Sequence, residues 1–437
     1  MTDSTTRSET EEQRSRALEA TLTLVARSGY QATTIAAVAK EAGLSESFIL
    51  WHFRNKDRLF AEALEYSYRK RRSTSPSWSE VVPPEKRAVA LRHNALGLTP
   101  PSAEGTEYRT FGLMLGLESR PVQPTARLRF TEFRGRTLSA ITSWWDRSLR
   151  IEDAIERMAA AELLGNLTLS AVDGRFINSV FSELDRDVTT DIIVAGLEGV
   201  ATRLEERPSA SLELPPAAAR AVASLPPAGP TQHDETSTRI QILRAAESVA
   251  SDIGIDSASI ARICKKCGCS PTSIYWFFKD KDAIFEALIE FLHKDWNDTH
   301  PRASKVGTPW SDDPLLEMMA HSLWRYSGAA NLMRISLMLF LHSEDTHTVT
   351  REECLRVRAE LCREWQDSYS RMFPELQHDE TLTHGVAMVH AAVSDGLFIS
   401  QQIAGGNGSM TAYTWVLSEF MDAGIRSVLP TRGPEAS

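Results

Sequence analysis

The sequence predicts an all-α protein built from two tandem copies of one helical module. Three observations lead to this expectation. Residues 14–60 match residues 239–285 without a gap, at a shift of 225 positions. Within each copy, apolar residues recur at steps of three and four, as they do on one face of a helix. Strand-like alternation bounded by turn pairs such as Asn-Gly is scarce.

The repeat keeps glycines, apolar residues and lysines in the same places. Matching pairs are Gly29 with Gly254, Ile35 with Ile260, Gly43 with Gly268, Ser45 with Ser270, Ile49 with Ile274, Trp51 with Trp276, Phe53 with Phe278, Lys56 with Lys281, Asp57 with Asp282 and Phe60 with Phe285. The same shift places Arg109 on Arg334, so the duplication continues beyond the first segment. We interpret the two halves as full copies of one domain plan.

Composition changes divide the chain into six segments. Between the copies lies a stretch rich in Pro, Ala and Ser, which cannot bury enough apolar surface to fold, although its alanines allow a short helix. The expected segments are a disordered tail over 1–13, a small helical domain over 14–64, a larger helical domain over 65–206, a linker over 207–238, and the two domains again over 239–289 and 290–430.

The overall composition is that of a folded protein. Hydrophobic residues make up 42% of the 437 residues and charged residues 24%. The first dozen residues are polar, and no apolar run reaches the roughly 20 residues that cross a bilayer, so we expect a cytoplasmic protein with no membrane partner. A formal charge of −10 argues against non-specific coating of nucleic acid but not against a sequence-specific binder.

Residues 34–53 carry the first motif. Thr34 can cap a helix, Gly43 suits the positive φ that follows a helix end, and Ser45 can cap a second short helix. Helix, glycine turn and helix form a helix-turn-helix unit, whose second helix enters the major groove of DNA. A plain corner between two helices is the structural alternative for such a motif taken alone.

The second copy repeats the motif over residues 259–278 with a stronger helix start. Ser270 stands at the cap, and Pro271 stands at the first helical position, where its missing N–H costs nothing. Lys56 and Lys281 begin the helix that follows each motif. A lysine at such a helix start is well placed for a DNA phosphate.

Both copies resemble the DNA-binding domain of the TetR family of one-component transcription regulators. The family pattern of Ser, Tyr, a His-Phe or Tyr-Phe pair and Lys corresponds to Ser45, Leu50, His52, Phe53 and Lys56 in the first copy, and to Ser270, Tyr275, Phe277, Phe278 and Lys281 in the second. About fifty residues of each half carry the resemblance, and later helices share only the pattern, including the Asp-Gly pairs at Asp173 and Asp395. The resemblance implies an effector pocket in each larger domain, whose last two helices form a dimer bundle.

The motif and the resemblance together predict the residues that contact DNA. They are Thr34, Ser45, Glu46, Ser47, Phe48, Leu50, Trp51, His52 and Lys56 in the first copy, and Ser259, Ser270, Pro271, Thr272, Ser273, Tyr275, Trp276, Phe277 and Lys281 in the second. Leu50 cannot donate the hydrogen bond of the usual Tyr, whereas Arg262, Lys265 and Lys266 add positive charge to the second copy. We therefore expect the second motif to bind DNA more strongly.

The two tryptophans of the motifs should point away from the core. Trp51 and Trp276 each lie two residues beyond a core-facing isoleucine, which is about 200° around a helix. Each indole then has two possible roles: it packs on DNA sugar and phosphate, or it covers a neighbouring helix.

Three of the five cysteines, Cys264, Cys267 and Cys269, lie together in the second motif. Their places in the repeat are those of Ala39, Ala42 and Leu44. We expect them to pack as small apolar side chains, because a structural zinc needs four ligands and no second Cys or His pair lies near. A thiol or metal sensor is the other interpretation.

Large apolar residues follow each motif, and by resemblance some of them line the effector pocket. The candidates are Met114, Trp144, Trp145, Phe176, Met338, Trp365 and Tyr369. Helical spacing alone predicts that each packs in a core. No phosphate-binding glycine loop, zinc-protease helix or nucleophile elbow is found, so we expect no enzyme, no catalytic residue, no cofactor and no metal.

The predicted function is a sequence-specific regulator of transcription, a repressor that a small ligand releases from a double-stranded DNA operator. The two halves either form a pseudo-dimer within one chain, or chains pair into a homodimer with four motifs. The rival hypothesis is a protein-interaction or ligand-sequestering module whose motifs have degenerated.

Overall fold

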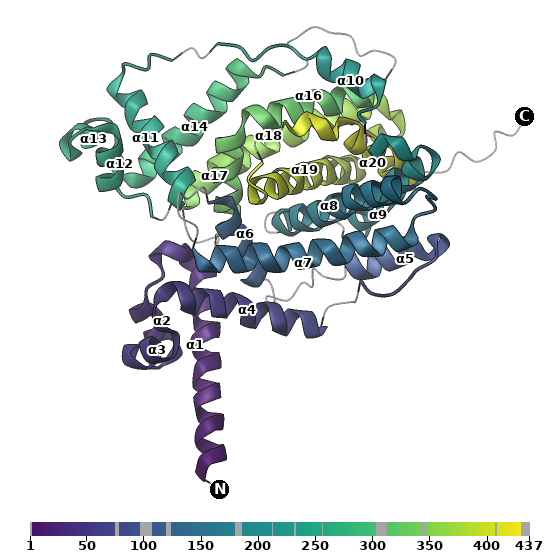
Figure 1. Cartoon of the computed structure of the whole chain (residues 1–437). Helices are drawn as coiled ribbons and strands as arrows, with labels where there is room; N and C mark the ends of the chain where they lie inside the picture. Colours follow the sequence, from purple (N-terminus) through teal and green to yellow (C-terminus); the bar gives the residue numbers. More distant parts are fainter. Residues whose placement is uncertain are drawn as a thin grey trace, which may run out of the picture.

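The structure is a computed structural model in which helices are joined by turns and short 3₁₀ segments (Figure 1). It describes residues 2–74, 78–96, 107–118, 124–179, 186–211, 213–230, 233–255, 257–302, 313–342, 347–406 and 409–429. Within these ranges no β-strand is present, so the predicted all-α class is confirmed.

Each half begins with four helices that carry the motif. They are α1 (Thr2–Ala32), α2 (Ile35–Ala42), α3 (Glu46–Phe53) and α4 (Lys56–Thr74) in the first half, and α11 (Thr238–Ile253), α12 (Ile260–Cys267), α13 (Pro271–Phe277) and α14 (Lys281–Thr299) in the second. The positions predicted for the buried face of each second helix, Ile49 and Phe53 in the first copy, are at most 1% exposed.

The N-terminal segment differs from the prediction. We expected a disordered tail over residues 1–13, but α1 runs as a helix from Thr2 and projects from the body of the molecule (Figure 1). No proline or glycine precedes Gly29, so nothing in the segment interrupts a helix, although Thr and Ser outnumber the stronger helix formers among residues 2–13. Extending a helix that is already nucleated by packing costs little.

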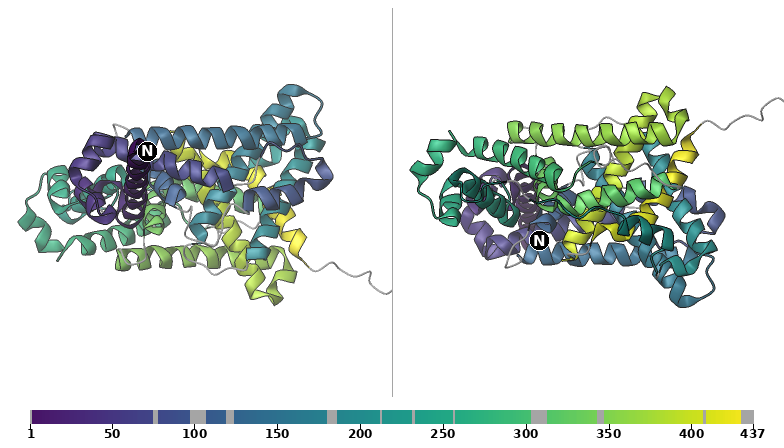
Figure 2. Two further views of the ribbon diagram at one scale, coloured as in Figure 1. Left: turned by 90° about the horizontal axis from the view of Figure 1, so that it is seen from below. Right: turned by 90° about the horizontal axis from the view of Figure 1, so that it is seen from above.

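The larger domains repeat the same order of helices. In the first half they are α5 (Arg87–Leu91), α6 (Glu107–Leu117), α7 (Thr125–Ser148), α8 (Ala154–Asn178) and α9 (Arg186–Glu206). In the second half they are α16 (Pro314–Gly328), α17 (Ala330–Leu341), α18 (Thr348–Met372), α19 (Glu380–Ile403) and α20 (Thr414–Val428). Figures 1 and 2 place both motif-bearing domains at the same end of the molecule.

The two halves meet in a four-helix bundle. Helix α8 packs on α19, and α9 packs on α20 (Figure 1). A Cβ atom added at Gly174 would lie 1.6 Å from the carbonyl oxygen of Ala392, and one added at Gly396 would lie 1.8 Å from that of Ser170. Only glycine allows two backbones to approach so closely. The two contacts are reciprocal, as in an interface with twofold symmetry.

A buried ion pair lies beside each of these glycines. Arg358 Nη2 is 2.6 Å from the carboxylate of Asp395, which is fully buried, and Arg134 pairs with Asp173 in the first half. Burial raises the pKa of Asp395, and the Arg358 guanidinium opposes that shift. Arg358 also donates a 2.7 Å hydrogen bond to Asn178, so the second pair links the two halves.

The segment between the halves is partly folded. Helix α10 (Pro216–Ala223) turns the buried residues Ala218 and Ala221 towards α16. Further on, the N–H of Gly229 donates to the carbonyl oxygen of Thr299 at the end of α14 (2.7 Å). The predicted linker therefore lies along the second half over part of its length.

Helix α19 is apolar enough, by length and composition, to pass a test for a membrane-spanning helix. However, 89% of its most apolar window is buried inside the protein. This burial is typical of the core helix of a bundle.

Candidate nucleic-acid interface

The first motif has the predicted caps. The hydroxyl of Thr34 accepts a hydrogen bond from the N–H of Ala37 (3.1 Å), and that of Ser45 accepts one from the N–H of Phe48 (3.1 Å). Gly43 ends α2 with φ of 64°. This left-handed conformation is easy for glycine and turns the chain directly into α3.

The second motif is built in the same way. Ser259 caps α12 through the N–H of Arg262 (3.3 Å), and Ser270 caps α13 through the N–H of Ser273 (3.2 Å). Gly268 lies between the helices with φ of 71°. Both copies therefore form a helix-turn-helix unit with a short, capped second helix.

The second helix of each motif, α3 and α13, has an inner and an outer face. Ile49 and Ile274 are 0% exposed, whereas Trp51 is 78% and Trp276 is 85% exposed. The prediction that both indoles point away from the core is confirmed. Side chains this exposed do not cover a neighbouring helix, so the second of their two possible roles is excluded.

The exposed apolar surface is larger in the second motif. Tyr275 (56% exposed) and Phe277 (43%) flank Trp276 on α13, whereas Leu50 (45%) is the neighbour of Trp51 on α3. The Tyr275 hydroxyl can donate to a DNA phosphate, and Leu50 has no donor.

The other predicted contact residues differ in exposure. Those at the solvent-exposed helix starts are Thr34, Ser45, Glu46, Ser47, Ser259, Ser270, Pro271 and Thr272. Phe48 and His52 are half-buried, with their rings 4.2 Å apart, and Ser273 is half-buried against the hydroxyl of Ser270.

Both predicted phosphate lysines lie over aromatic rings of their own domain. The Lys56 ammonium is 4.9 Å from the centre of the Tyr30 ring, and Lys281 is 5.8 Å from that of Phe285. Cation–π attraction of this kind restrains a flexible lysine. Each charge therefore stays near the end of the preceding recognition helix.

Two acidic residues that the sequence interpretation missed attach the motifs to the larger domains. Asp57 on α4 accepts a hydrogen bond from the N–H of Thr125, the first residue of α7 (3.1 Å). Its counterpart Asp282 on α14 lies 3.8 Å from the ring of His347, which precedes α18. The match between the two aspartates was visible in the repeat, but their partners are too distant in sequence to be predicted.

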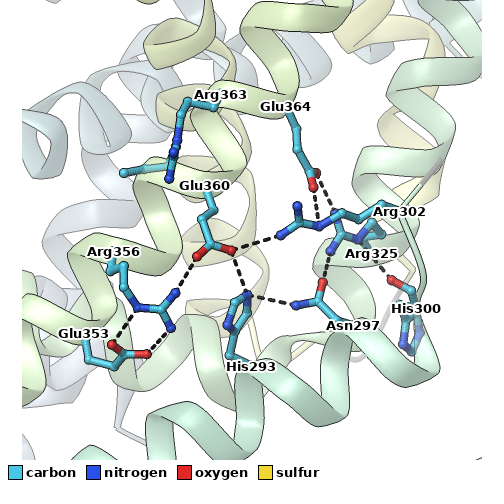
Figure 3. A network of polar contacts seen from close by, with 11 residues as sticks. His293, Asn297, His300, Arg302, Arg325, Glu353, Arg356, Glu360, Arg363 and Glu364 are labelled. Atoms are coloured by element: carbon cyan, nitrogen blue, oxygen red, sulfur yellow. Dashed lines mark hydrogen bonds and ion pairs between the residues drawn. The ribbon is translucent and has the colours of Figure 1, made fainter. Parts of the chain in front are cut away.

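A network of charged side chains joins α14 to α16 and α18 in the second half (Figure 3). Glu360 on α18 is 3.9 Å from the His293 ring and 3.0 Å from the Arg302 guanidinium. Arg325 on α16 pairs with Glu364 (3.0 Å), and burial lowers the pKa of Arg325 to about 10. The network holds α14, the helix that follows the second motif, against the larger domain.

The cysteines of the second motif differ in part from the prediction. Cys264 is buried, in agreement with apolar packing. Cys267 and Cys269, however, are half-buried and joined by a disulfide, because the glycine turn brings residues two apart in sequence close together. Among the described residues, no three His, Cys, Asp or Glu side chains are grouped as a metal site requires.

The predicted effector-pocket residues all lie in the core. Met114, Trp144, Trp145, Phe176, Met338, Trp365 and Tyr369 are each at most 6% exposed. A cavity of about 910 Å³ lies elsewhere, between α1, α4 and the start of α7, and its lining includes Arg14, Tyr66, Lys70 and Arg129. The role of the seven core residues in ligand binding remains a prediction.

Comparisons with known proteins support the interpretation of the motifs. The family model for bacterial regulatory proteins of the tetR family matches residues 17–63 and 242–288. The chain is 41% identical over 58 residues to the HTH-type transcriptional regulator UidR of Escherichia coli strain K12, which is 13% of this chain and 30% of UidR. It is 23% identical over 180 residues to the HTH-type transcriptional regulator BetI of Yersinia pestis strain Pestoides F, which is 38% of this chain and 82% of BetI.

Proposed function

The chain belongs to the TetR family of bacterial regulatory proteins through two copies of its DNA-binding domain, and on this premise we propose a ligand-released repressor that acts as an intramolecular pseudo-dimer. It binds a double-stranded DNA operator in the cytoplasm. The observation that carries the proposal is the presence of two capped helix-turn-helix units, each with an exposed recognition helix, at one end of the molecule (Figures 1 and 2).

The pseudo-dimer is supported by the way in which helices of the same chain cover the surface of α8 and α9. In the family pattern, the last two helices of the ligand-binding domain pair with those of a second chain. Here α8 and α9 are covered by α19 and α20 of the same chain. A second copy has no equivalent free surface on these helices, so one chain can present two recognition helices by itself.

The operator is then asymmetric. The recognition helices α3 and α13 present different side chains, so the two half-sites differ in sequence. Groove fit requires the two helices to lie about 34 to 36 Å apart, one turn of DNA. A small effector that binds better to a form of the protein with another helix spacing lowers its affinity for DNA. By linkage, bound DNA lowers the affinity for the effector by the same factor.

Light scattering of the purified protein tests the pseudo-dimer. We expect a molar mass near 48.6 kDa with and without operator DNA, after subtraction of the DNA. Twice that value at micromolar protein concentration contradicts the proposal and favours a homodimer with four motifs.

The ranking of the two motifs is tested by matched substitutions. We expect Lys281→Ala with Tyr275→Phe to weaken operator binding by about tenfold or more, because two phosphate contacts are lost. Lys56→Ala, in the motif that lacks the tyrosine, has a smaller effect. The opposite order in a binding titration contradicts the ranking.

A salt titration separates operator binding from the rival function. True operator binding weakens steeply as salt increases yet survives competitor DNA, and the double substitution lowers the magnitude of the salt slope by about one, because it removes one positive charge. A chain that binds no DNA from its own promoter region, or from a random pool, fits a protein-interaction or ligand-sequestering module instead.

A further inference from the structure

The turn of the second motif contains a covalent link that the first motif lacks. A disulfide joins Cys267, the last residue of α12, to Cys269, with Gly268 between them. Their Cα atoms are 5.4 Å apart, a usual separation for bonded cysteines. In the first copy Ala42 and Leu44 occupy these two places. The link therefore lies where the direction of α13 is set.

The two turns are closed by different interactions. In the first copy, the N–H of Gly43 donates to the carbonyl oxygen of Lys40 (3.2 Å), and that of Leu44 donates to Ala39 (2.9 Å). In the second copy, whose turn residues are all described, the two N–H groups after α12 make no bond of normal geometry to the helix end. The disulfide is the interaction that closes this turn in place of the two hydrogen bonds.

Cys267 and Cys269 are also the cysteines that small thiols and disulfides can reach. Cys267 and Cys269 are half-buried, whereas Cys264, Cys354 and Cys362 are buried and free. Burial raises the pKa of Cys354 to about 12, so its thiolate is scarce at neutral pH. Lys265 and Lys266, the exposed residues that precede Cys267, add positive charge to the end of α12.

We propose that Cys267 and Cys269 form a thiol–disulfide exchange site that controls the order of the second recognition helix. Its chemical partners are small thiols and small disulfides, RSH and RSSR. On oxidation, one thiolate attacks RSSR, forms a mixed disulfide and releases RS⁻. The other thiolate attacks the protein sulfur of that mixed disulfide, closes the Cys267–Cys269 bond and releases a second RS⁻. The cysteines lose two electrons and two protons, and two RSH are formed.

Reduction leaves the turn without either kind of closure. The end of α12 and the start of α13 are then connected by Gly268, Cys269 and Ser270, and Gly268 is the most flexible of the three. The recognition helix samples more orientations, and binding to the second half-site has to order it again. The effect on DNA rests on the function proposed above, whereas the effect on the turn does not.

Hydrogen–deuterium exchange of the full chain tests the turn without DNA. The protein is oxidised with oxidised glutathione or reduced with dithiothreitol, and thiol titration under native conditions reports two thiols gained on reduction. We expect amides of residues 268–278 to exchange several times faster after reduction. Residues 43–53 of the first copy serve as the internal control and remain unchanged.

The variant Cys267→Ala with Cys269→Leu carries the residues of the first copy and provides the matched control. Its exchange must be the same in both redox conditions. Unchanged exchange in the reduced wild-type protein, or no disulfide formed with oxidised glutathione, overturns the proposal. The proposal is also overturned if reduction speeds hydrogen–deuterium exchange in the double variant as much as in the wild type.

Binding to a DNA fragment selected by the full chain from a random pool gives the second measurement. Reduction weakens wild-type binding by about five- to tenfold, the effect of losing one restraint of ordinary strength, and leaves the double variant unchanged. Equal affinity of the two redox forms overturns the role in DNA binding. If no fragment is selected, the proposed function fails. The hydrogen–deuterium exchange experiment still tests whether the disulfide orders the turn.

Discussion

Replacing Gly174 with alanine lowers the free energy of unfolding by about 3 kcal/mol. The added methyl group would lie 1.6 Å from the carbonyl oxygen of Ala392, so α8 and α19 have to separate. Because the halves meet along these helices, the separation also loosens the packing of α9 on α20. Urea unfolding followed by far-UV circular dichroism measures the change.

Gly135→Ala is the matched control. Gly135 lies inside α7, and a Cβ there meets nothing within 4 Å. Alanine favours helix over glycine, so this variant is expected to gain about 0.5 to 1 kcal/mol. If Gly174→Ala were as stable as Gly135→Ala, the close crossing of α8 and α19 would be refuted, and with it the intramolecular bundle.

Replacing Arg358 with alanine costs about 3 to 5 kcal/mol, because it leaves the carboxylate of Asp395 buried without its counter-charge. Asp395 is 0% exposed, so its carboxylate has no contact with bulk solvent to replace the lost guanidinium. Protonation of Asp395 limits the loss at low pH, since burial already raises its pKa. We therefore expect a smaller difference from the wild type at pH 5 than at pH 8.

Arg356→Ala on the same helix isolates the effect of burial. Arg356 pairs with Glu353 and Glu360 but is half exposed, so its loss costs no more than about 1 kcal/mol. The double variant Arg358→Met with Asp395→Leu removes both buried charges and recovers most of the lost stability. If Arg356→Ala and Arg358→Ala lower the free energy of unfolding equally, the ion pair of Arg358 with Asp395 is not buried and unscreened.

Local features of the motifs were predictable residue by residue. Thr34, Ser45, Ser259 and Ser270 act as caps because a hydroxyl at this position accepts from an N–H three residues on, whatever the rest of the chain does. The exposure of Trp51 and Trp276 follows from the helical repeat in the same way. Such features depend on neighbours within one turn of helix, and the sequence specifies those neighbours directly.

Features that depend on distant partners were missed or incomplete. Asp57 was visible as a repeated residue, but its bond to the start of α7 is a contact across 68 positions. Cys267 and Cys269 pack against the hydrophobic core as predicted, but the disulfide between them was missed. The geometry of the turn, rather than the composition of these positions, brings the two sulfurs together.

By itself, the sequence determined that the protein is helical, that it is duplicated, and that each copy contains a helix-turn-helix unit with a capped second helix. Periodicity, glycine conformation and capping are local, so they can be read without coordinates. Only the tertiary structure decided that α8 and α9 pack on α19 and α20 of the same chain, and that Arg358 joins Asp395 and Asn178 across the two halves. Those contacts depend on how closely two distant backbones approach, and the interdigitation of side chains, not any single segment, sets that distance.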